Sequence, residues 1–151
     1  PSGNLLFVER GNHRVRLFCR EPGTYFGIPM ASGSVYTIAG KGIATTEPVT
    51  LGDGKDGLEA TLNSPRGLAL DAWGNLYIAD WGNQRIRRLT PDRRLSTVAG
   101  RGEKSSIGAV DVGDGGPALK ATFSNPTGLA IYRDWLYISD ASNHRVRRIP
   151  L

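Results

Sequence analysis

The chain has 151 residues, of which 20 are glycine and 9 are proline, a share that favours many short elements joined by turns. Apolar residues make up 39% and charged residues 22%, which excludes wholesale disorder and permits one domain with a hydrophobic core. No apolar run reaches the roughly 18 residues of a membrane span, the lone Cys19 excludes an internal disulfide, and the net charge of +5 falls short of a nucleic-acid-binding tail. The chain opens on Pro1 with neither an initiator methionine nor a signal-peptide pattern, so we expect a soluble chain whose natural N-terminus lies upstream.

The sequence repeats itself. An apolar stretch, a turn that contains Asn and an Arg-rich stretch follow one another in three places, at residues 4–16, 75–87 and 135–147. A second element that ends in Ala-Gly recurs at residues 36–40 and 96–100, and a third that contains Pro and then Gly-Leu-Ala recurs at residues 63–70 and 124–131. Such a period is typical of a repeat architecture.

Each unit is predicted to contain four short strands, called a, b, c and d here. In the second unit they are Gly67–Asp71, Asn75–Asp80, Arg85–Thr90 and Ser96–Gly100. All four are apolar or β-branched and are bounded by Gly, Pro, Asn or Asp, which favour tight turns. Strands joined in a row by tight turns form an antiparallel meander, and a repeated four-stranded meander predicts an all-β fold made of β-propeller blades.

The pattern that runs from Pro65 through Gly67-Leu-Ala to Arg87 resembles the NHL repeat, the blade unit of propellers that usually have six blades. The stretches at residues 97–100 and 113–118 are similar to the long-blade variety that is common in bacterial surface and secreted proteins. The resemblance covers nearly the whole chain. It implies an extracellular or cell-surface location, and it says little about function because a propeller hosts unrelated activities.

The strands add up to about two and a half blades. Strands b to d of a first blade occupy residues 4–40, a complete second blade occupies residues 67–100, and strands a to c of a third occupy residues 128–149. The first blade has a longer c–d connection, from Arg20 to Ser34. We expect a fragment of a six-bladed propeller, whose open strand edges need the remaining blades or other chains to close the ring.

Arginine recurs in every strand c, and an acid stands five residues before the first Arg of each copy. These pairs are Glu9 with Arg14, Asp80 with Arg85 and Asp140 with Arg145. A fixed spacing across a hairpin indicates a repeated structural ion pair, and we expect the other Arg residues to be exposed. The alternative is a basic stripe for nucleic acid.

One face of a propeller carries the b–c turns and the d–a connections, which are long here, and it is called the b–c face below. Long loops on a rigid scaffold are where binding usually resides. We predict that Trp81, an aromatic residue in a turn, anchors a partner there. The predicted ligand-binding residues of this face are Asn12, His13, Arg66, Trp81, Asn83, Gln84, Asn143 and His144.

The d–a connections carry two further expectations. Residues 116–123 should form a short helix with Pro117 at its first position, and residues 57–62 should form a less sharply capped one. Asp53 and Asp56, like Asp111 and Asp114, are three residues apart in Gly-rich loops, but they lack the other ligands of a calcium loop, so turn formation is the preferred interpretation.

No nucleophile elbow, phosphate loop or zinc-ligand set occurs, and His13 and His144 cannot make a zinc site alone. We therefore predict no cofactor, no metal and no catalytic residue in this chain. The predicted function is a non-catalytic binding or scaffold module for a protein, peptide or glycan. Two alternatives remain open: a propeller lyase or hydrolase whose catalytic residues lie outside this chain, and a nucleic-acid-binding propeller that uses the Arg-rich strands.

Overall fold

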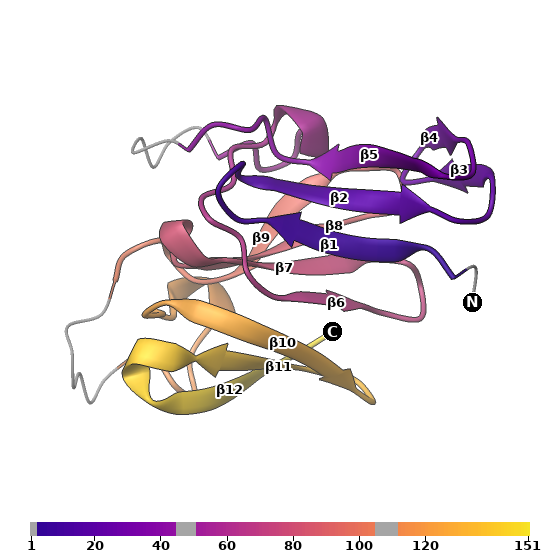
Figure 1. Cartoon of the computed structure of the whole chain (residues 1–151). Helices are drawn as coiled ribbons and strands as arrows, with labels where there is room; N and C mark the ends of the chain where they lie inside the picture. The colour runs from indigo at the N-terminus through magenta and orange to yellow at the C-terminus, as the bar shows by residue number, and fades with distance from the viewer. Residues whose placement is uncertain (1–2, 45–50, 105–111) are drawn as a thin grey trace.

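The computed structural model describes residues 3–44, 51–104 and 112–151. The described chain is all-β, as predicted, and consists of successive antiparallel sheets (Figure 1). The first sheet has the order β1-β2-β5, with β1 Leu5–Glu9, β2 Arg14–Cys19 and β5 Ser34–Ala39. The second has the order β6-β7-β8-β9, with β6 Leu68–Leu70, β7 Leu76–Asp80, β8 Arg85–Leu89 and β9 Leu95–Ala99. The third has the order β10-β11-β12, with β10 Pro126–Tyr132, β11 Trp135–Asp140 and β12 Arg145–Pro150.

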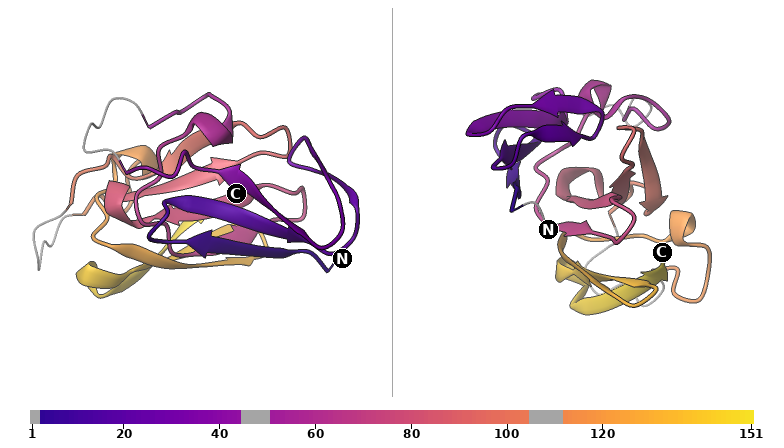
Figure 2. Two further views of the ribbon diagram at one scale, coloured as in Figure 1. Left: turned by 45° about the horizontal axis from the view of Figure 1, so that its top comes forward. Right: turned by 90° about the vertical axis from the view of Figure 1, so that its right-hand side faces the viewer.

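The three sheets follow one another in space in the order in which they occur in the chain. Figure 2 shows the indigo first sheet, the pink second sheet and the yellow third sheet in succession. The second and third sheets are antiparallel meanders of sequence-adjacent strands, and in the first sheet the β3–β4 segment lies between β2 and β5 in sequence. In the four-stranded second sheet strand a is β6, b is β7, c is β8 and d is β9. This is the arrangement of propeller blades.

The turns explain why these strands form where they do. In the a–b turn of the second sheet, the Asp71 carboxylate accepts hydrogen bonds from the backbone N–H groups of Trp73 and Asn75 at 2.9 and 2.8 Å. Each b–c turn ends on a residue with left-handed backbone, namely His13, Gln84 or His144, with φ between 52° and 54°. The three turns share this conformation although their side chains differ, so the repeats match in backbone geometry as well as in sequence.

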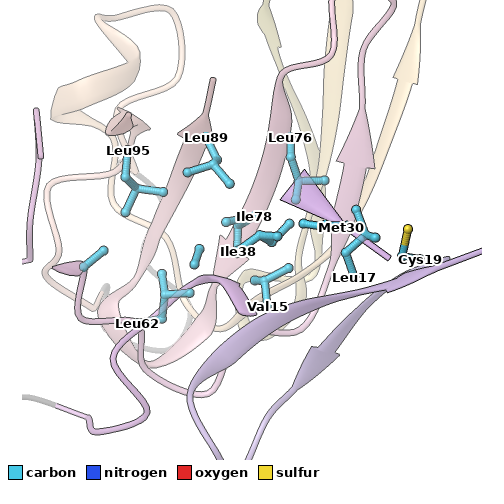
Figure 3. Packing of buried hydrophobic residues seen from close by; sticks show 12 residues of the cluster. Val15, Leu17, Cys19, Met30, Ile38, Leu62, Leu76, Ile78, Leu89 and Leu95 are labelled. Carbon is cyan, nitrogen blue, oxygen red and sulfur yellow. The ribbon is translucent and has the colours of Figure 1, made fainter. Parts of the chain in front are cut away.

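Apolar side chains fill the space between neighbouring sheets. Val15 and Ile38 of the first sheet pack with Leu62, Ile78 and Leu89, and all five are fully buried (Figure 3). A second cluster, which includes Ile86, Phe123 and Ile138, joins the second and third sheets. Burying one such side chain contributes roughly 1.5–3 kcal/mol, so the two clusters fix each blade against the next.

The c–d connection of the first sheet contains an additional hairpin. Strands β3 (Gly23–Tyr25) and β4 (Ile28–Met30) pair with each other and not with the three-stranded sheet. Met30 is buried in the first core cluster, and Tyr25 and Phe26 pack against it. The sequence marks this connection as long, but the hairpin itself was not predicted because it has no counterpart in the other repeats.

The short helices of the d–a connections are single 3-10 turns, η1 (Gly57–Glu59) and η3 (Ala118–Lys120). Their capping is the reverse of the prediction. The Asp56 carboxylate caps η1 by accepting from the N–H of Leu58, whereas Pro117 precedes η3 and supplies no side-chain cap. In the described parts of the chain, no helix is long and apolar enough to cross a membrane.

Candidate functional site

The acid at the end of each strand b pairs with the second Arg of strand c, so the prediction that it pairs with the first is wrong. Asp80 lies 3.1 Å from Arg87, Glu9 lies 3.0 Å from Arg16, and Asp140 lies 3.5 Å from Arg147. Residues two apart on a strand share a face, so both Arg side chains start on the same side of the sheet as the acid. In the second and third sheets the second guanidinium, which lies diagonally across from the acid, is largely buried.

The first Arg of strand c takes another partner. Arg85 donates to the backbone carbonyl of Arg101 at 2.9 Å, and Arg14 donates to that of Lys41 at 3.4 Å. The expectation that the remaining strand c arginines are exposed is also wrong for two of them, because the side chain of Arg87 is fully buried and that of Arg147 is 9% exposed. Arg87 and Arg147 therefore do not contribute to an exposed basic stripe along the c strands.

The Asp-Gly loops of the d–a connections complete this network. Arg87 donates to Asp53 and to the carbonyl of Leu51, both at 3.0 Å. Arg147 makes the equivalent bonds to Asp114, at 2.8 Å, and to the carbonyl of Val112, at 3.1 Å. Asp53 and Asp114 thus each bind an arginine, whereas the sequence analysis predicted only that they form turns. Asp111 lies outside the described residues.

The amides of the b–c turns belong to the same network. Asn83 donates to Asp80, and Asn143 donates to Asp140, in both cases at 2.8 Å. Burial raises the pKa of Asp80 above its ordinary value, while the nearby Arg87 and the hydrogen bond from the N–H of Asn63 act in the opposite direction. Asn83 and Asn143 were both predicted to contact a ligand. In the structure their side-chain amides donate to the buried carboxylates of Asp80 and Asp140.

Two of the residues that end the b–c turns, His13 and Gln84, connect one blade to the next. The N–H of Ser64 donates to Nδ1 of His13 at 2.9 Å, and the N–H of Asn125 donates to Oε1 of Gln84 at 2.7 Å. His144, the third member of this series, is exposed, and so is Asn12. His13 and Gln84 therefore hold the following d–a connection in place.

Trp81 is half-buried on the b–c face, between two guanidinium groups. The Arg66 guanidinium lies 4.7 Å from the ring centroid, and that of Arg10 lies 5.7 Å from it. The structure thus brings together the predicted residues Trp81 and Arg66 and adds Arg10, which was not predicted. Arg10 occupies the position of Trp81 in the first repeat, so adjacent copies of one repeat position meet on this face.

An apolar concavity lies on the opposite face, which carries the a–b and c–d turns and is called the a–b face below. A pocket of about 340 Å³ opens between the first and second sheets. Its lining includes Tyr25 and Phe26 from the β3–β4 hairpin, Trp73 and Leu70 from the second sheet and Pro91 from a c–d turn. Trp73 is 68% exposed and Leu70 is 50% exposed. The sequence analysis predicted ligand-binding residues on the b–c face, because it did not predict the hairpin whose residues line this pocket.

One polar group at this pocket is incompletely bonded. The side-chain oxygen of Asn4 accepts from the N–H groups of Arg20 and Glu21 at 2.8 and 3.1 Å. Its amide nitrogen is buried and has no hydrogen-bond partner among the described residues. A buried donor without a partner costs free energy.

No cluster of three or more His, Cys, Asp or Glu side chains suited to a metal ion occurs in the described ranges. The acid with a raised pKa, Asp80, is fully buried and bonded to Arg87 and Asn83. Its perturbed pKa therefore reflects a structural role and does not mark an exposed acid–base group.

Comparison with known proteins supports the repeat assignment. A family model of the NHL repeat matches residues 62–89. Human teneurin-4 is 31% identical over 156 aligned residues, which cover 97% of this chain and 6% of teneurin-4. Two crystal structures from Bacteroides thetaiotaomicron are similar in fold. A protein of unknown function has a TM-score of 0.70 and 26% identity, and an auxiliary nutrient binding protein has a TM-score of 0.68 and 25% identity.

The alignment with the first structure covers 96% of this chain and 32% of that protein, and with the second 95% and 33%. This chain therefore spans about a third of these structures and a small part of teneurin-4. Three repeats in the sequence, successive antiparallel meanders in the structure and the family match agree with one another. The chain contains an NHL repeat at residues 62–89 and has the fold of an NHL-type β-propeller.

Proposed function

We propose that the chain is a non-catalytic binding module, and that its pocket on the a–b face accepts an apolar side chain of a protein or peptide partner. The character of the pocket carries this proposal. Tyr25, Phe26 and Trp73 meet in a lining that contains no charged residue. Concave, mostly apolar sites with a few polar groups are the usual form of ligand pockets, and a volume of about 340 Å³ lies within their range.

The polar groups of the pocket favour a peptide over a glycan. A sugar presents many hydroxyl groups and needs several hydrogen-bonding side chains, whereas the polar side-chain groups of this lining are those of Asn4, Thr24 and Tyr25 and the indole N–H of Trp73. The Tyr25 hydroxyl already donates to the carbonyl of Glu21 at 3.0 Å.

The b–c face is the second candidate, because Trp81 between Arg10 and Arg66 forms a cationic aromatic cluster. Its neighbours are less available to a ligand than the sequence suggested. Asn83 is bonded to Asp80, and Gln84 to the N–H of Asn125. Trp81 itself is half-buried, whereas Trp73 is 68% exposed. We therefore give the a–b face priority.

The two other functions predicted as alternatives have weaker support. Nucleic-acid binding needs a contiguous basic surface, and the second Arg of each strand c is paired with the acid at the end of strand b. A lyase or hydrolase needs an accessible acid or base, and strand a in the second sheet, which lines the axial channel of a propeller, reads Leu68-Ala69-Leu70. The name of the nutrient binding protein agrees with a binding role.

A displayed library of random peptides, selected on the full chain, tests the proposal. We expect the selected peptides to share an aromatic or large aliphatic residue and to lose affinity for Trp73→Ala but not for Trp81→Ala. Truncating an aromatic anchor typically costs about 2 kcal/mol or more, on the order of a 30-fold loss. Peptides that depend on Trp81 and ignore Trp73 would assign the site to the b–c face.

A further inference from the structure

Two arginines of the b–c face, Arg10 and Arg66, gather around one aromatic ring, that of Trp81. Their guanidinium carbons lie 5.7 and 4.7 Å from the ring centroid. Among the described residues, neither guanidinium has a carboxylate or another hydrogen-bond acceptor within bonding distance. Contact with an indole ring does not pair the N–H groups of a guanidinium with an acceptor, so these donors remain available to a ligand.

The acids that stand beside this cluster in the sequence bond elsewhere. Glu9, which precedes Arg10, pairs with Arg16 at 3.0 Å. Asp80, which precedes Trp81, is fully buried and belongs to the internal network described above. Two like charges thus stand close together without a counter-charge from these acids, and such an arrangement favours a bound anion.

Hydrogen bonds join the three segments that carry the cluster. The N–H of Ser64 donates to Nδ1 of His13 at 2.9 Å, which ties the first b–c turn to the connection that contains Arg66. The N–H of Gly82 donates to the carbonyl of Asn63 at 2.8 Å, which ties the second b–c turn to the same connection. Donors carried on joined segments lose less conformational freedom when a ligand binds.

The cluster is not part of the repeated framework. In the next repeat, Thr127 stands at the position of Arg66. The b–c turn residues that correspond to Arg10 and Trp81 at the next junction are Trp81 and Ala141. The second and third sheets therefore pack together without a pair of arginines at this place, so the junction itself does not require them.

We propose that Arg10 and Arg66 form a carboxylate-binding site, whose ligand is an acidic peptide segment of a partner protein. Guanidinium groups match the two oxygens of a carboxylate in geometry, and such charge-assisted hydrogen bonds are stronger than neutral ones. An Asp or Glu side chain and the C-terminus of a chain both supply this group. The site is separate from the apolar pocket of the a–b face and does not depend on it.

The arginines that flank the cluster are engaged, which favours a compact anion over a nucleic acid. Arg85 donates to the backbone carbonyl of Arg101, whose own side chain pairs with Glu103 at 2.7 Å. Arg14 donates to the carbonyl of Lys41. A nucleic acid gains its affinity from many phosphate contacts in a row, and these bonded arginines do not offer such a row of free guanidinium groups.

Short labelled peptides of glycine and serine with blocked ends provide the probes, one with added glutamates and a matched one with glutamines. We expect saturable binding of the glutamate peptide to the full chain at low salt by fluorescence polarisation, and no binding of the glutamine peptide. Arg10→Gln and Arg66→Gln should each weaken binding by about 10-fold. Added salt should also weaken it, because exposed charges are screened. A glutamine peptide with a free C-terminus distinguishes a terminal carboxylate from a side-chain carboxylate.

Arg133→Gln is the matched control, because it removes the same charge from another arginine beside an aromatic ring. Arg133 is exposed in the a–b turn of the third sheet, 5.1 Å from the centroid of the Tyr132 ring. This variant should bind the glutamate peptide as the unaltered chain does. Trp73→Ala, which alters the apolar pocket, should also leave this binding unchanged, so failure of one proposal is distinguishable from failure of the other.

Three results would overturn the proposal. The first is the absence of saturable binding by both carboxylate-bearing peptides. The second is an equal loss for Arg10→Gln, Arg66→Gln and Arg133→Gln, since that result indicates attraction to the net charge alone. The third is tighter binding of a single-stranded oligonucleotide of equal charge that depends on Arg10 and Arg66, because it would assign the site to phosphate. Unfolding curves verify that each variant is folded.

Discussion

The guanidinium of Arg87 lies 3.1 Å from the carboxylate of Asp80, and neither side chain has any exposed surface. Arg87 also bonds to Asp53, so a single buried cation ties strand b, strand c and the preceding d–a connection together. The third sheet repeats this arrangement with Arg147, Asp140 and Asp114. These buried charges position the long connections of the b–c face.

Replacing Arg87 with methionine should lower the free energy of unfolding by about 3–5 kcal/mol, because it leaves the Asp80 carboxylate buried without its cation. Urea unfolding followed by circular dichroism measures the change. Adding Asp80→Asn to Arg87→Met should restore part of the loss, because a neutral amide needs no counter-charge. A double variant less stable than Arg87→Met would contradict this account.

The matched control is Arg94→Met. The Arg94 side chain is 69% exposed and lies 3.6 Å from the equally exposed Asp92. Exposed pairs of this kind contribute about 0–1 kcal/mol, so the control should remain within about 1 kcal/mol of the unaltered chain. Equal losses at Arg87 and Arg94 would show that burial of the ion pair has no special importance.

Gln84 holds the second sheet to the third through one side-chain acceptor. Gln84→Ala leaves the N–H of Asn125 without its partner, and we expect a loss of about 1–2 kcal/mol in the free energy of unfolding. Asn12→Ala, at an exposed position of the equivalent turn in the first sheet, should change stability far less. Equal effects of the two substitutions in urea unfolding would remove the inter-sheet role from Gln84.

The pair between Asp56 and Arg93 gives a prediction about acid. The hydrogen bonds from Arg93 hold the pKa of Asp56 below its ordinary value of 3.8. A lowered pKa in the folded state contributes stability that is present above 3.8 and is lost as the pH falls through the lowered value. The melting temperature of the unaltered chain should therefore exceed that of Asp56→Asn at neutral pH, and the gap should close in strong acid. A gap that does not depend on pH would contradict the assignment.

The open faces of the first and third sheets should make the isolated chain self-associate. Val146 is 73% exposed, and Leu5 and Val35 on the first sheet are 59% and 44% exposed. Exposed apolar faces and open strand edges favour association. Sedimentation velocity should show species heavier than the monomer that increase with protein concentration. A compact monomer at all concentrations would refute this prediction.

The strand order could be predicted from the sequence because the repeats align residue by residue. The partner of the acid could not, since Arg85 and Arg87 share a face of the strand, and the choice between them depends on Asp53 approaching from a distant connection. Repeat spacing alone does not contain that contact. The alignment did, however, identify Asp53 and Asp114 as equivalent positions.

The pocket on the a–b face was missed for a related reason. Tyr25 and Phe26 belong to a hairpin that interrupts a single repeat, so no second copy marks their role. Trp81 was predicted to bind a partner because it is an aromatic residue in a turn. The two arginines beside it were harder to predict, because Arg10 belongs to a different repeat and Arg66 to a d–a connection. The repeats in the sequence therefore predict the three sheets. The aromatic residues Tyr25 and Phe26 of the candidate site belong to a segment that does not repeat.

The affinity of one selected peptide for Trp73→Ala and for Trp81→Ala tests the central claim, that the pocket on the a–b face binds a partner. Isothermal titration calorimetry on both variants, with unfolding curves to verify that each is folded, gives the comparison. The account predicts a loss on the order of 30-fold for Trp73→Ala and a change of less than about threefold for Trp81→Ala. Unchanged binding to folded Trp73→Ala, together with loss of binding to Trp81→Ala, would contradict it.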